Sequence, residues 1–504
     1  MADLPVVDAT GLCMCVRGTF FFLEGIGDLA VAIAWPLEVP LDASLLHMFG
    51  EDDPWRKQAD SLARLKSMLT ATESSNRRNK AFSQSAEASL ECESLRVGVT
   101  EAAGRCLRAA RPVGRGALLL RETAHAAVLW SHCRRTHCHY CLVFVPPAAR
   151  EIRCDGCSEL YCSVRCHDAA WTCGHDAECG RPLLQCILPR TVLMCMRALC
   201  KDDGGTAVQS DLDRLLALHD HQSSMHPTRR SQIRFHAHAA FSALQPALAA
   251  RSDASSRNRT TPTESQLARL LRLSLTNSFA VRDVRGGAAV GEALFPTASL
   301  FNHACEPNTN VRHVGRTLEV RASAALGAGE EALICYGPQA GFMPRPARQE
   351  ELRRVYHFAC GCAACVRESS QRIHEHLGQT VAERRHSQPN PAQQDRTVLR
   401  RRAQQLDDRA RHACERGAFR EAAQLTEHAI ALLRGVFPSG STQLAHEAAK
   451  LGQLRFNASA DAQAKASLMS AARELAACYG DDHEEVVELL RLAAMCHPAA
   501  LDVP

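Results

Sequence analysis

Eight metal-ligand residues fall within 42 positions of this chain, and they constrain its fold more than any other feature. They form three cysteine pairs and one histidine–cysteine pair, each with two or three residues between its members: Cys138, Cys141, Cys154, Cys157, Cys162, Cys166, His175 and Cys179. Both side chains of such a pair can reach one ion, and four ligands close a tetrahedral structural zinc site. The cluster therefore predicts two zinc sites, and a chance gathering of buried cysteines is a poor alternative.

The spacing also suggests how the ligands are shared. Only four residues separate Cys157 from Cys162, which favours interleaving, with the first and third pairs on one ion and the second and fourth on the other. Five neighbours lie close enough to replace a ligand, so the sequence leaves a swap open: Cys133, His137, His139, His167 and Cys173. The module holds little apolar material, so we expect it to need its metal to fold.

A second cluster supplies only three ligands, Cys360, Cys362 and Cys365. A fourth must come from elsewhere, and Cys305 is the candidate. The alternative is that Cys305 is a small buried thiol.

Composition narrows the class of protein. The 504 residues suggest about three domains. A net charge of +4, from 59 basic and 55 acidic residues, is too balanced for nucleic-acid binding through bulk electrostatics. A hydrophobic content of 46% excludes a wholly disordered chain. The many cysteines have the spacing of metal ligands and do not suggest a disulfide framework, which favours a reducing compartment.

The most apolar N-terminal stretch is residues 18–37. Glu24 and Asp28 interrupt it and Pro36 lies near its end, so we expect a buried strand or helix there, with no membrane span and no signal peptide. The polar piece at 73–93 reads as a helix or a loose linker, and residues 1–95 carry no assignable chemistry.

Strand and helix patterns surround the clusters. Short β-like runs at 117–120 and 126–129 precede the first cluster, and apolar periodic segments at 183–199 and 233–250 predict two helices joined by a loop. Thr261 as N-cap, with Pro262 and Glu264 behind it, predicts a capping box and a helix that runs toward Asn277. Strands and turns then fill 280–336.

The C-terminal region is rich in Ala and Leu and predicts helices. The pattern at 418–433 and 443–454 has an echo about 42 residues later, at 460–477 and 484–492. Two copies suggest stacked helix pairs like tetratricopeptide repeats, and a plain helical bundle explains the pattern equally well.

Three ordered motifs resemble those of a known family. The segment 299–308, Ser-Leu-Phe-Asn-His-Ala-Cys-Glu-Pro-Asn, resembles the NHSCxPN motif of SET-domain lysine methyltransferases, and 329–337 resembles their GEELxxxY motif. The 360–365 cluster resembles the post-SET zinc site, whose fourth ligand in that family is the motif cysteine, here Cys305. The first cluster matches the MYND zinc finger ligand by ligand, including Trp171 before its histidine.

Their order resembles the SET-and-MYND (SMYD) family, and most of all its fourth member, which carries tetratricopeptide-like repeats. The implied fold class is α+β: a β-rich split SET domain with an inserted MYND finger, a post-SET zinc site and a TPR-like helical C-terminal domain. The implied divisions are an N-terminal region of unknown role (1–95), the first SET part (96–132), the MYND finger (133–180), a helical insert (181–260), the catalytic SET part (261–340), the post-SET segment (341–367), a linker (368–398) and the helical domain (399–504).

The resemblance also implies site residues. Gly104 and Arg105 would lie on the N-terminal cofactor loop, and the other S-adenosylmethionine contacts would be Asn277, Asn302, His303, Tyr336 and Phe358. Tyr336 and Tyr356 would form the catalytic lysine channel. Two departures stand out: Cys106 replaces a second glycine of the cofactor loop, and Ala304 replaces the usual serine of the motif.

The implied function is an S-adenosylmethionine-dependent protein-lysine N-methyltransferase with three structural Zn²⁺ ions. We expect a monomer that acts on a protein lysine, takes proline-rich peptides through its finger, contacts no nucleic acid or membrane directly, and works in cytoplasm and nucleus. The alternatives are a catalytically weak SET/MYND scaffold, which Cys106 favours, and a transcriptional corepressor adaptor.

Overall fold

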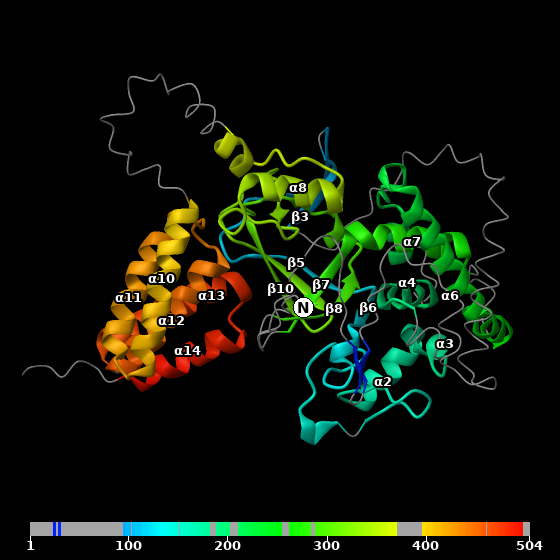
Figure 1. Ribbon diagram of the computed structural model, residues 1–504, viewed down its shortest axis with the longest axis horizontal. Coiled ribbons are helices and arrows are strands. Elements are labelled where there is room, and N and C mark those ends of the chain that lie inside the picture. Colours follow the sequence, from blue (N-terminus) through cyan, green and yellow to red (C-terminus); the bar gives the residue numbers. More distant parts are fainter. Residues whose placement is uncertain are drawn as a thin grey trace, which may run out of the picture.

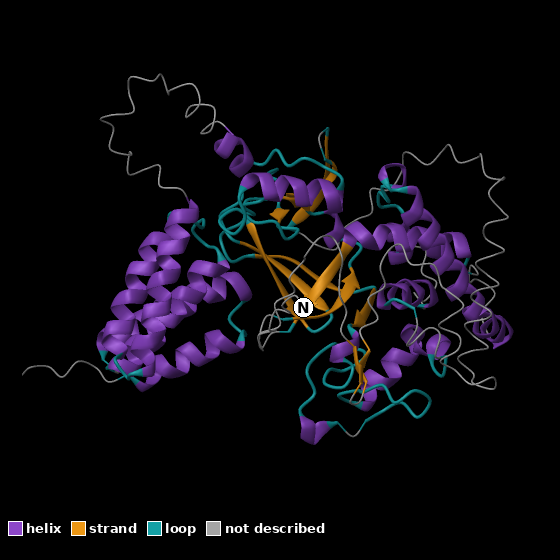
Figure 2. Cartoon of the chain, in the orientation of Figure 1, coloured by secondary structure: helices purple, strands orange, loops and turns teal. Residues whose placement is uncertain are grey.

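The structure, a computed structural model, describes residues 24–26, 29–31, 94–101, 103–150, 152–181, 188–201, 210–254, 262–283, 288–369, 396–459 and 461–496. Strands occupy the centre of the molecule and helices flank them on two sides (Figures 1 and 2). This mixture of helices and sheets agrees with the predicted α+β fold class.

The centre consists of small sheets that join distant parts of the chain. One sheet has the order β10-β11-β5 and another β6-β8-β7. Their strands are β5 (Leu118–Thr123), β6 (Ala126–Leu129), β7 (Ser278–Arg282), β8 (Ala289–Leu294), β10 (Thr309–Val314) and β11 (Thr317–Ala322). Because each sheet pairs a strand from before the cysteine-rich segment with strands from after the helical insert, the two halves form one folding unit.

Two short pairings carry the predicted motifs. β3 (Leu95–Thr100) and β4 (Gly104–Ala109) form an antiparallel hairpin, and β9 (Asn302–His303) runs parallel to β12 (Leu333–Ile334). The second pairing brings the 299–308 motif beside the 329–337 motif.

Large apolar side chains from both halves fill the space between these strands. Leu107, Leu119, Phe295 and Phe301 are each at most 1% exposed. Burying a side chain of this size contributes about 1.5–3 kcal/mol, so this core fixes the positions of the strand ends that carry the motifs.

The segment that separates the two groups of strands is helical. It comprises α4 (Arg190–Cys200), α5 (Asp211–Leu216), α6 (Pro227–Ala254) and α7 (Glu264–Asn277), which lie together on one side of the strands (Figure 1). The two predicted helices correspond to α4 and α6. The sequence analysis missed α5, whose six residues are too few to show a period.

The predicted capping box is wrong in register. The N-cap of α7 is Thr263 and not Thr261, because the Thr263 hydroxyl accepts from the Gln266 N–H while the Gln266 side chain accepts from the Thr263 N–H. Pro262 precedes the helix, and Thr261 lies outside the described residues. The predicted end of the helix at Asn277 is confirmed.

The C-terminal region is helical, as predicted. Its helices are α10 (Arg396–Glu415), α11 (Phe419–Leu433), α12 (Thr442–Ala458), α13 (Ala462–Tyr479) and α14 (Glu484–Met495). They lie on the opposite side of the strands from the insert (Figure 1). The two echoing sequence segments correspond to the helix pairs α11–α12 and α13–α14.

This helical region packs directly on the central strands. A Cβ added at Gly440, where φ is +85°, would lie 2.1 Å from the Ser323 carbonyl oxygen, so only glycine fits the contact. Arg312 of β10 also pairs with Asp482, in the turn between α13 and α14, at 3.1 Å.

Several sequence predictions concern regions of which the structure describes few residues. Within residues 18–37 it describes two three-residue strands, β1 (Glu24–Ile26) and β2 (Leu29–Val31), which pair antiparallel. The polar piece at 73–93 and most of the linker at 368–398 lie outside the described residues. Among the described helices, none is long and apolar enough to cross a membrane.

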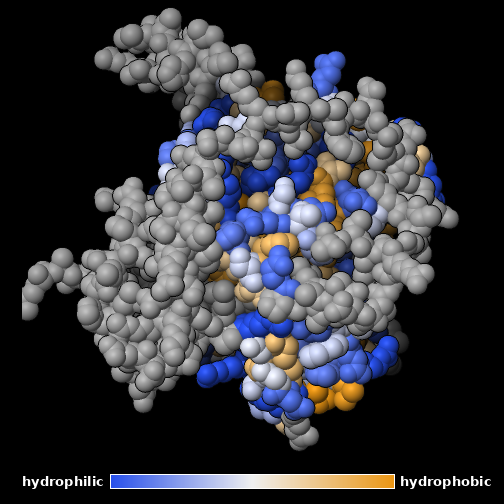
Figure 3. All heavy atoms as spheres, turned by 90° about the vertical axis from the view of Figure 1, so that its right-hand side faces the viewer, coloured by the Kyte–Doolittle hydropathy of each residue, from blue (hydrophilic) through white to orange (hydrophobic). Residues whose placement is uncertain are grey.

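The face on the side of the insert is largely polar where it is described. Figure 3 shows hydrophilic residues over much of its coloured surface, with smaller apolar patches between them. Scattered apolar surface of this kind is normal for folded proteins.

Candidate functional site

The first cysteine cluster folds into two separate groups of four ligand atoms. Cys138, Cys141, Cys162 and Cys166 form one group, and Cys154, Cys157, His175 and Cys179 form the other; within each group all ligand atoms lie within 4.8 Å of one another. This is the interleaved arrangement that the spacing favours, and no neighbouring histidine or cysteine replaces a ligand in either group.

The distances suit zinc. Tetrahedral zinc with bonds of 2.3 Å places its sulfur ligands about 3.8 Å apart. In the structure Cys141 and Cys162 are 3.6 Å apart, Cys162 and Cys166 3.5 Å, and Cys154 and Cys179 3.4 Å. These residues can therefore hold two Zn²⁺ ions in closed structural sites.

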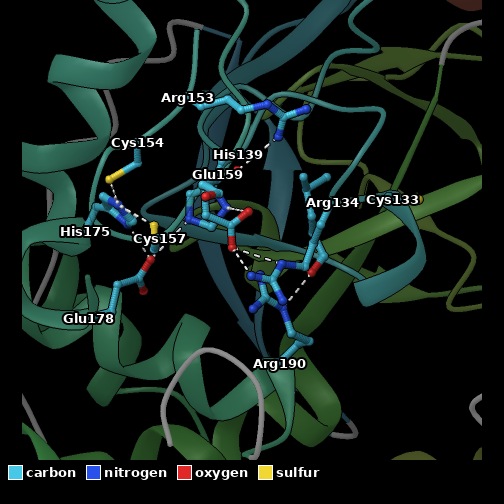
Figure 4. Close-up of polar contacts among 12 residues, drawn as sticks. Cys133, Arg134, His139, Arg153, Cys154, Cys157, Glu159, His175, Glu178 and Arg190 are labelled. Carbon is cyan, nitrogen blue, oxygen red and sulfur yellow. Dashed lines mark hydrogen bonds and ion pairs between the residues drawn. The ribbon is translucent and has the colours of Figure 1, made fainter. Parts of the chain in front are cut away.

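A carboxylate outside the second group orients its histidine. Glu178 Oε1 lies 2.8 Å from His175 Nδ1, which leaves Nε2 facing Cys154 and Cys157 at 3.4 Å from each sulfur (Figure 4). A hydrogen bond of this kind fixes the ring and its tautomer for metal binding.

Glu178 also belongs to a buried charge network that joins the first cysteine cluster to the central strands. Arg197 of α4 donates to Glu178 at 2.7 Å and to the Ala127 carbonyl of β6 at 2.7 Å. Burial alone would raise the pKa of Glu178, but Arg197 and the hydrogen bonds from His139 and His175 outweigh it and hold the pKa well below its usual range. Glu178 is therefore ionised in this network.

A second buried carboxylate, Glu159, completes the network. It lies 3.1 Å from His139 and 2.5 Å from Arg134 (Figure 4). Its pKa is also lowered, because His139 and Arg134 outweigh its burial.

The three histidines among the five neighbours that could have competed for metal have other surroundings. His139, with His175 and Glu178, forms a further group of potential ligands, but the Arg197 guanidinium contacts both His139 and Glu178, so a cation already fills that space. His137 faces Asp283 and His167 faces Asp168.

The third group joins Cys305 of the 299–308 motif to the 360–365 cluster, as predicted. Cys305, Cys360, Cys362 and Cys365 present sulfurs within 4.8 Å of one another. Cys305 lies 3.9 Å from Cys360 and 3.6 Å from Cys365, so it is placed to be the fourth ligand. Two N–H donors, from Gln349 at 3.3 Å and Arg348 at 3.7 Å, point at the Cys365 sulfur and would offset the charge of four thiolates.

Tyr336 and Tyr356 form the centre of a cluster of aromatic side chains next to this third group. This cluster and the residues around it are called the aromatic pocket below. Their ring centroids are 4.9 Å apart. The Tyr336 hydroxyl donates to the Phe301 carbonyl at 2.7 Å, and the Tyr356 hydroxyl donates to the Tyr336 carbonyl at 2.9 Å. Burial raises the pKa of both phenols, that of Tyr356 to about 12, so both hydroxyls stay protonated at neutral pH.

His303 and Phe358 close the same pocket. The His303 ring lies 5.2 Å from Tyr336 and 6.1 Å from Phe358. Its Nδ1 accepts the Tyr336 backbone N–H at 3.0 Å and its Nε2 lies 3.4 Å from Cys305. Burial lowers the pKa of His303 to about 4, so the ring is neutral and serves as a link between the pocket and the third cysteine group.

The predicted cofactor loop lies against Asn302. The Asn302 amide donates to the Arg105 carbonyl at 3.3 Å. Gly104 has a φ of +71° and its Cβ position opens on free space, so the backbone is accessible there. The Cys106 side chain is fully buried and lies on the face of β4 opposite Leu107, with its sulfur beside Gly98 of β3.

Asn277 reaches the motif through its backbone. The Ser299 hydroxyl lies 3.4 Å from the Asn277 carbonyl, while the Asn277 amide donates to Leu273 within α7. The structure thus brings the predicted residues from five separate segments of the chain to one region.

The sequence analysis missed two contributors to this region. The Glu122 carboxylate accepts from the Thr297 and Ala298 N–H groups, both at 2.8 Å, and so fixes the turn that leads to Asn302. The loop after α5 lies over the site, since Arg105 donates to the Ala217 carbonyl at 2.7 Å and the His221 ring lies 5.4 Å from that of His357. Neither has a sequence signal, because each depends on contacts between distant segments.

Comparison with known proteins agrees with this geometry. The family model "SET domain" matches residues 104–337. Human "N-lysine methyltransferase SMYD2" is 26% identical over 348 residues, which cover 68% of this chain and 75% of that protein. Human "Protein-lysine N-methyltransferase SMYD4" is 43% identical over 76 residues, 15% of this chain and 10% of that protein.

The chain therefore carries a SET domain at residues 104–337 and is similar to SMYD lysine methyltransferases. A solved structure titled "Crystal structure of the SET domain of LSMT bound to Lysine and AdoHcy" covers 88% of this chain and 91% of its own, at 11% identity and a TM-score of 0.25. A likeness that low carries no argument about ligands.

Proposed function

We propose that this protein is an S-adenosylmethionine-dependent protein-lysine N-methyltransferase. The observation that carries the proposal is the convergence of His303, Tyr336, Tyr356 and Phe358 on one aromatic cluster, with Asn302 next to His303 in β9, within a chain that matches the SET domain model at residues 104–337. The relatives named as lysine methyltransferases support the same reaction and a protein substrate.

The residues present fit the cofactor. Gly104 offers open backbone, Asn302 an amide, and the rings of Phe358 and Tyr336 apolar walls; Arg105 and Asn277 flank them, and together with His303 these residues would hold it. When bound, S-adenosylmethionine supplies a methyl group on a positively charged sulfur.

Tyr336 and Tyr356 would hold the substrate lysine. Both hydroxyls donate their protons to backbone carbonyls, so each phenol oxygen remains available to accept from the amine. In-line transfer to an amine needs positioning more than a strong base. The lysine must be neutral, and an apolar aromatic channel disfavours its charged form.

The finer architecture is also a proposal. We infer that the first two cysteine groups form a MYND finger, that the third is a post-SET site, and that the C-terminal helices are TPR-like, with three structural zinc ions in all. The finger would take proline-rich peptides and the helices would select protein partners by shape. We further propose a monomer that acts in cytoplasm and nucleus, with no direct contact to nucleic acid or membrane.

The test is methyl transfer with labelled S-adenosylmethionine. Zinc-loaded protein is incubated with a library of lysine-containing peptides, and the products are hydrolysed and analysed for methyllysine. The proposal predicts methyllysine with the wild type and a large loss with Tyr336→Phe. Cofactor binding without methyllysine would favour the scaffold alternative, and absence of both would overturn the proposal.

A further inference from the structure

Three segments that are distant in sequence meet at the side-chain amide of Asn302. Its Nδ2 donates to the carboxylate of Glu331 at 2.8 Å and to the backbone carbonyl of Arg105 at 3.3 Å. Glu331 is the second glutamate of the 329–337 motif, in which the proposed reaction uses only Tyr336. One amide group therefore links that motif, the 299–308 motif and the cofactor loop.

These contacts determine which way the amide faces. Both partners of Nδ2 are acceptors, so a flipped amide would place its oxygen against two other oxygens. Within the described residues, the Asn302 Oδ1 takes part in no hydrogen bond. Asn302 is half-buried, so this oxygen remains an accessible acceptor in the pocket.

The carboxylate of Glu331 is committed to this one contact. Its backbone is fixed separately, because the Asn308 side chain donates to the Glu331 carbonyl at 2.9 Å. The side chain of Glu331 accepts from no other group in the described part of the chain. A charged acceptor makes a hydrogen bond about twice as strong as a neutral one, which suits it to hold the amide.

We propose that Glu331 is a positioning residue for cofactor binding, which acts through Asn302 and presents the Asn302 Oδ1 to a cationic N–H donor of the bound cofactor. The inference rests on the proposed function, since it requires that the pocket bind S-adenosylmethionine. It assigns a purpose to the second glutamate of the motif beyond local folding.

Glu330 is a matched control. It carries the same side chain one position earlier, but its carboxylate accepts the Gly327 N–H at 2.9 Å and only closes an exposed turn. The two glutamates thus separate positioning of Asn302 from general effects of charge or turn stability.

The experiment measures S-adenosylmethionine affinity by calorimetry in full-length, zinc-loaded protein. We expect Glu331→Met, which removes the acceptor, to weaken binding about tenfold, and Glu331→Gln, which keeps a neutral acceptor, to weaken it about threefold. Glu330→Met should bind like the wild type. Thermal unfolding and zinc content, measured in parallel, report any general damage.

A double-mutant cycle with Asn302→Ala tests the route of the effect. If Glu331 acts through Asn302, the variant that combines Asn302→Ala with Glu331→Gln binds no more weakly than Asn302→Ala alone. Additive losses, or equal losses for the Glu330 and Glu331 variants, would overturn the inference. Should Glu331→Met fail to fold, the glutamine variant and this cycle still decide the question.

The result also separates this inference from the proposed function. A wild type that does not bind S-adenosylmethionine refutes the proposed function. A wild type that binds, beside Glu331 variants that bind equally well, refutes only the role of Glu331.

Discussion

The finger and the aromatic pocket are held together by opposite means. The finger relies on cysteine groups and on buried charges, with Glu178 and Arg197 only 1% and 9% exposed. The pocket relies on neutral tyrosine hydroxyls that donate to backbone carbonyls. Because of this difference, loss of one zinc ligand should unfold the finger, whereas loss of one tyrosine hydroxyl should lower the activity with little change in stability.

The largest effect should come from a finger ligand. His175→Ala removes one of four ligands in the second group, and a site with three ligands has no closed shell. We expect bound zinc to fall from three ions per chain to two or fewer and the finger to unfold, as measured by elemental analysis and proteolysis. Retention of three ions with an intact finger would contradict the metal assignment.

The buried charges should come next. Arg197→Met removes the arginine that pairs with the buried Glu178 carboxylate, which should cost about 3–5 kcal/mol in the free energy of unfolding. Denaturant unfolding measures the loss. The matched control is Arg354→Met, because Arg354 and Glu351 form an exposed pair, 43% and 38% accessible, that should contribute at most about 1 kcal/mol.

The β10-β11-β5 sheet should make the free energy of unfolding depend on pH. Burial lowers the pKa of His313 on β10 to about 4, so between about pH 6.5 and 4 the unfolded chain binds a proton that the folded chain does not. Stability should therefore fall through that window, by roughly 3 kcal/mol for this residue. His313→Phe should flatten the pH profile, since the His313 Nε2 has no hydrogen-bond partner among the described residues.

The pocket tyrosine should show the smallest stability change and a selective loss of activity. Tyr336→Phe removes the hydroxyl that donates to the Phe301 carbonyl, which should cost about 1 kcal/mol of stability. Loss of alignment should lower kcat/KM by about 10–100-fold. Tyr479→Phe, in the C-terminal helices, is the control and should leave kcat/KM unchanged. An unfolded Tyr336→Phe protein would break the comparison between finger and pocket.

The same contrast explains how far the sequence could be interpreted. The ligands of the finger lie within 42 residues, so their spacing alone suggested which cysteines share an ion, and the structure groups them in that way. The motif residues around Tyr336 could be found only through a family resemblance. Glu122 and Glu331 meet their partners 175 and 29 positions away, and no local pattern marks such contacts.

The wrong prediction of the N-cap residue of α7 has a different cause. Thr261 and Thr263 have the same side chain, and each is followed by residues that could serve in a cap. Only the reciprocal hydrogen bonds with Gln266 select Thr263. The presence of the helix could be predicted from the sequence pattern, whereas its first residue depended on the geometry of these hydrogen bonds.

The most direct test of the account is binding of S-adenosylmethionine to the zinc-loaded, full-length protein, with Asn302→Ala as the comparison. Calorimetry should detect micromolar binding by the wild type, and the substitution should weaken it strongly while unfolding and zinc content stay the same. Failure of the folded wild type to bind would contradict the enzyme assignment. Equal binding by both proteins would contradict the placement of the cofactor beside Asn302.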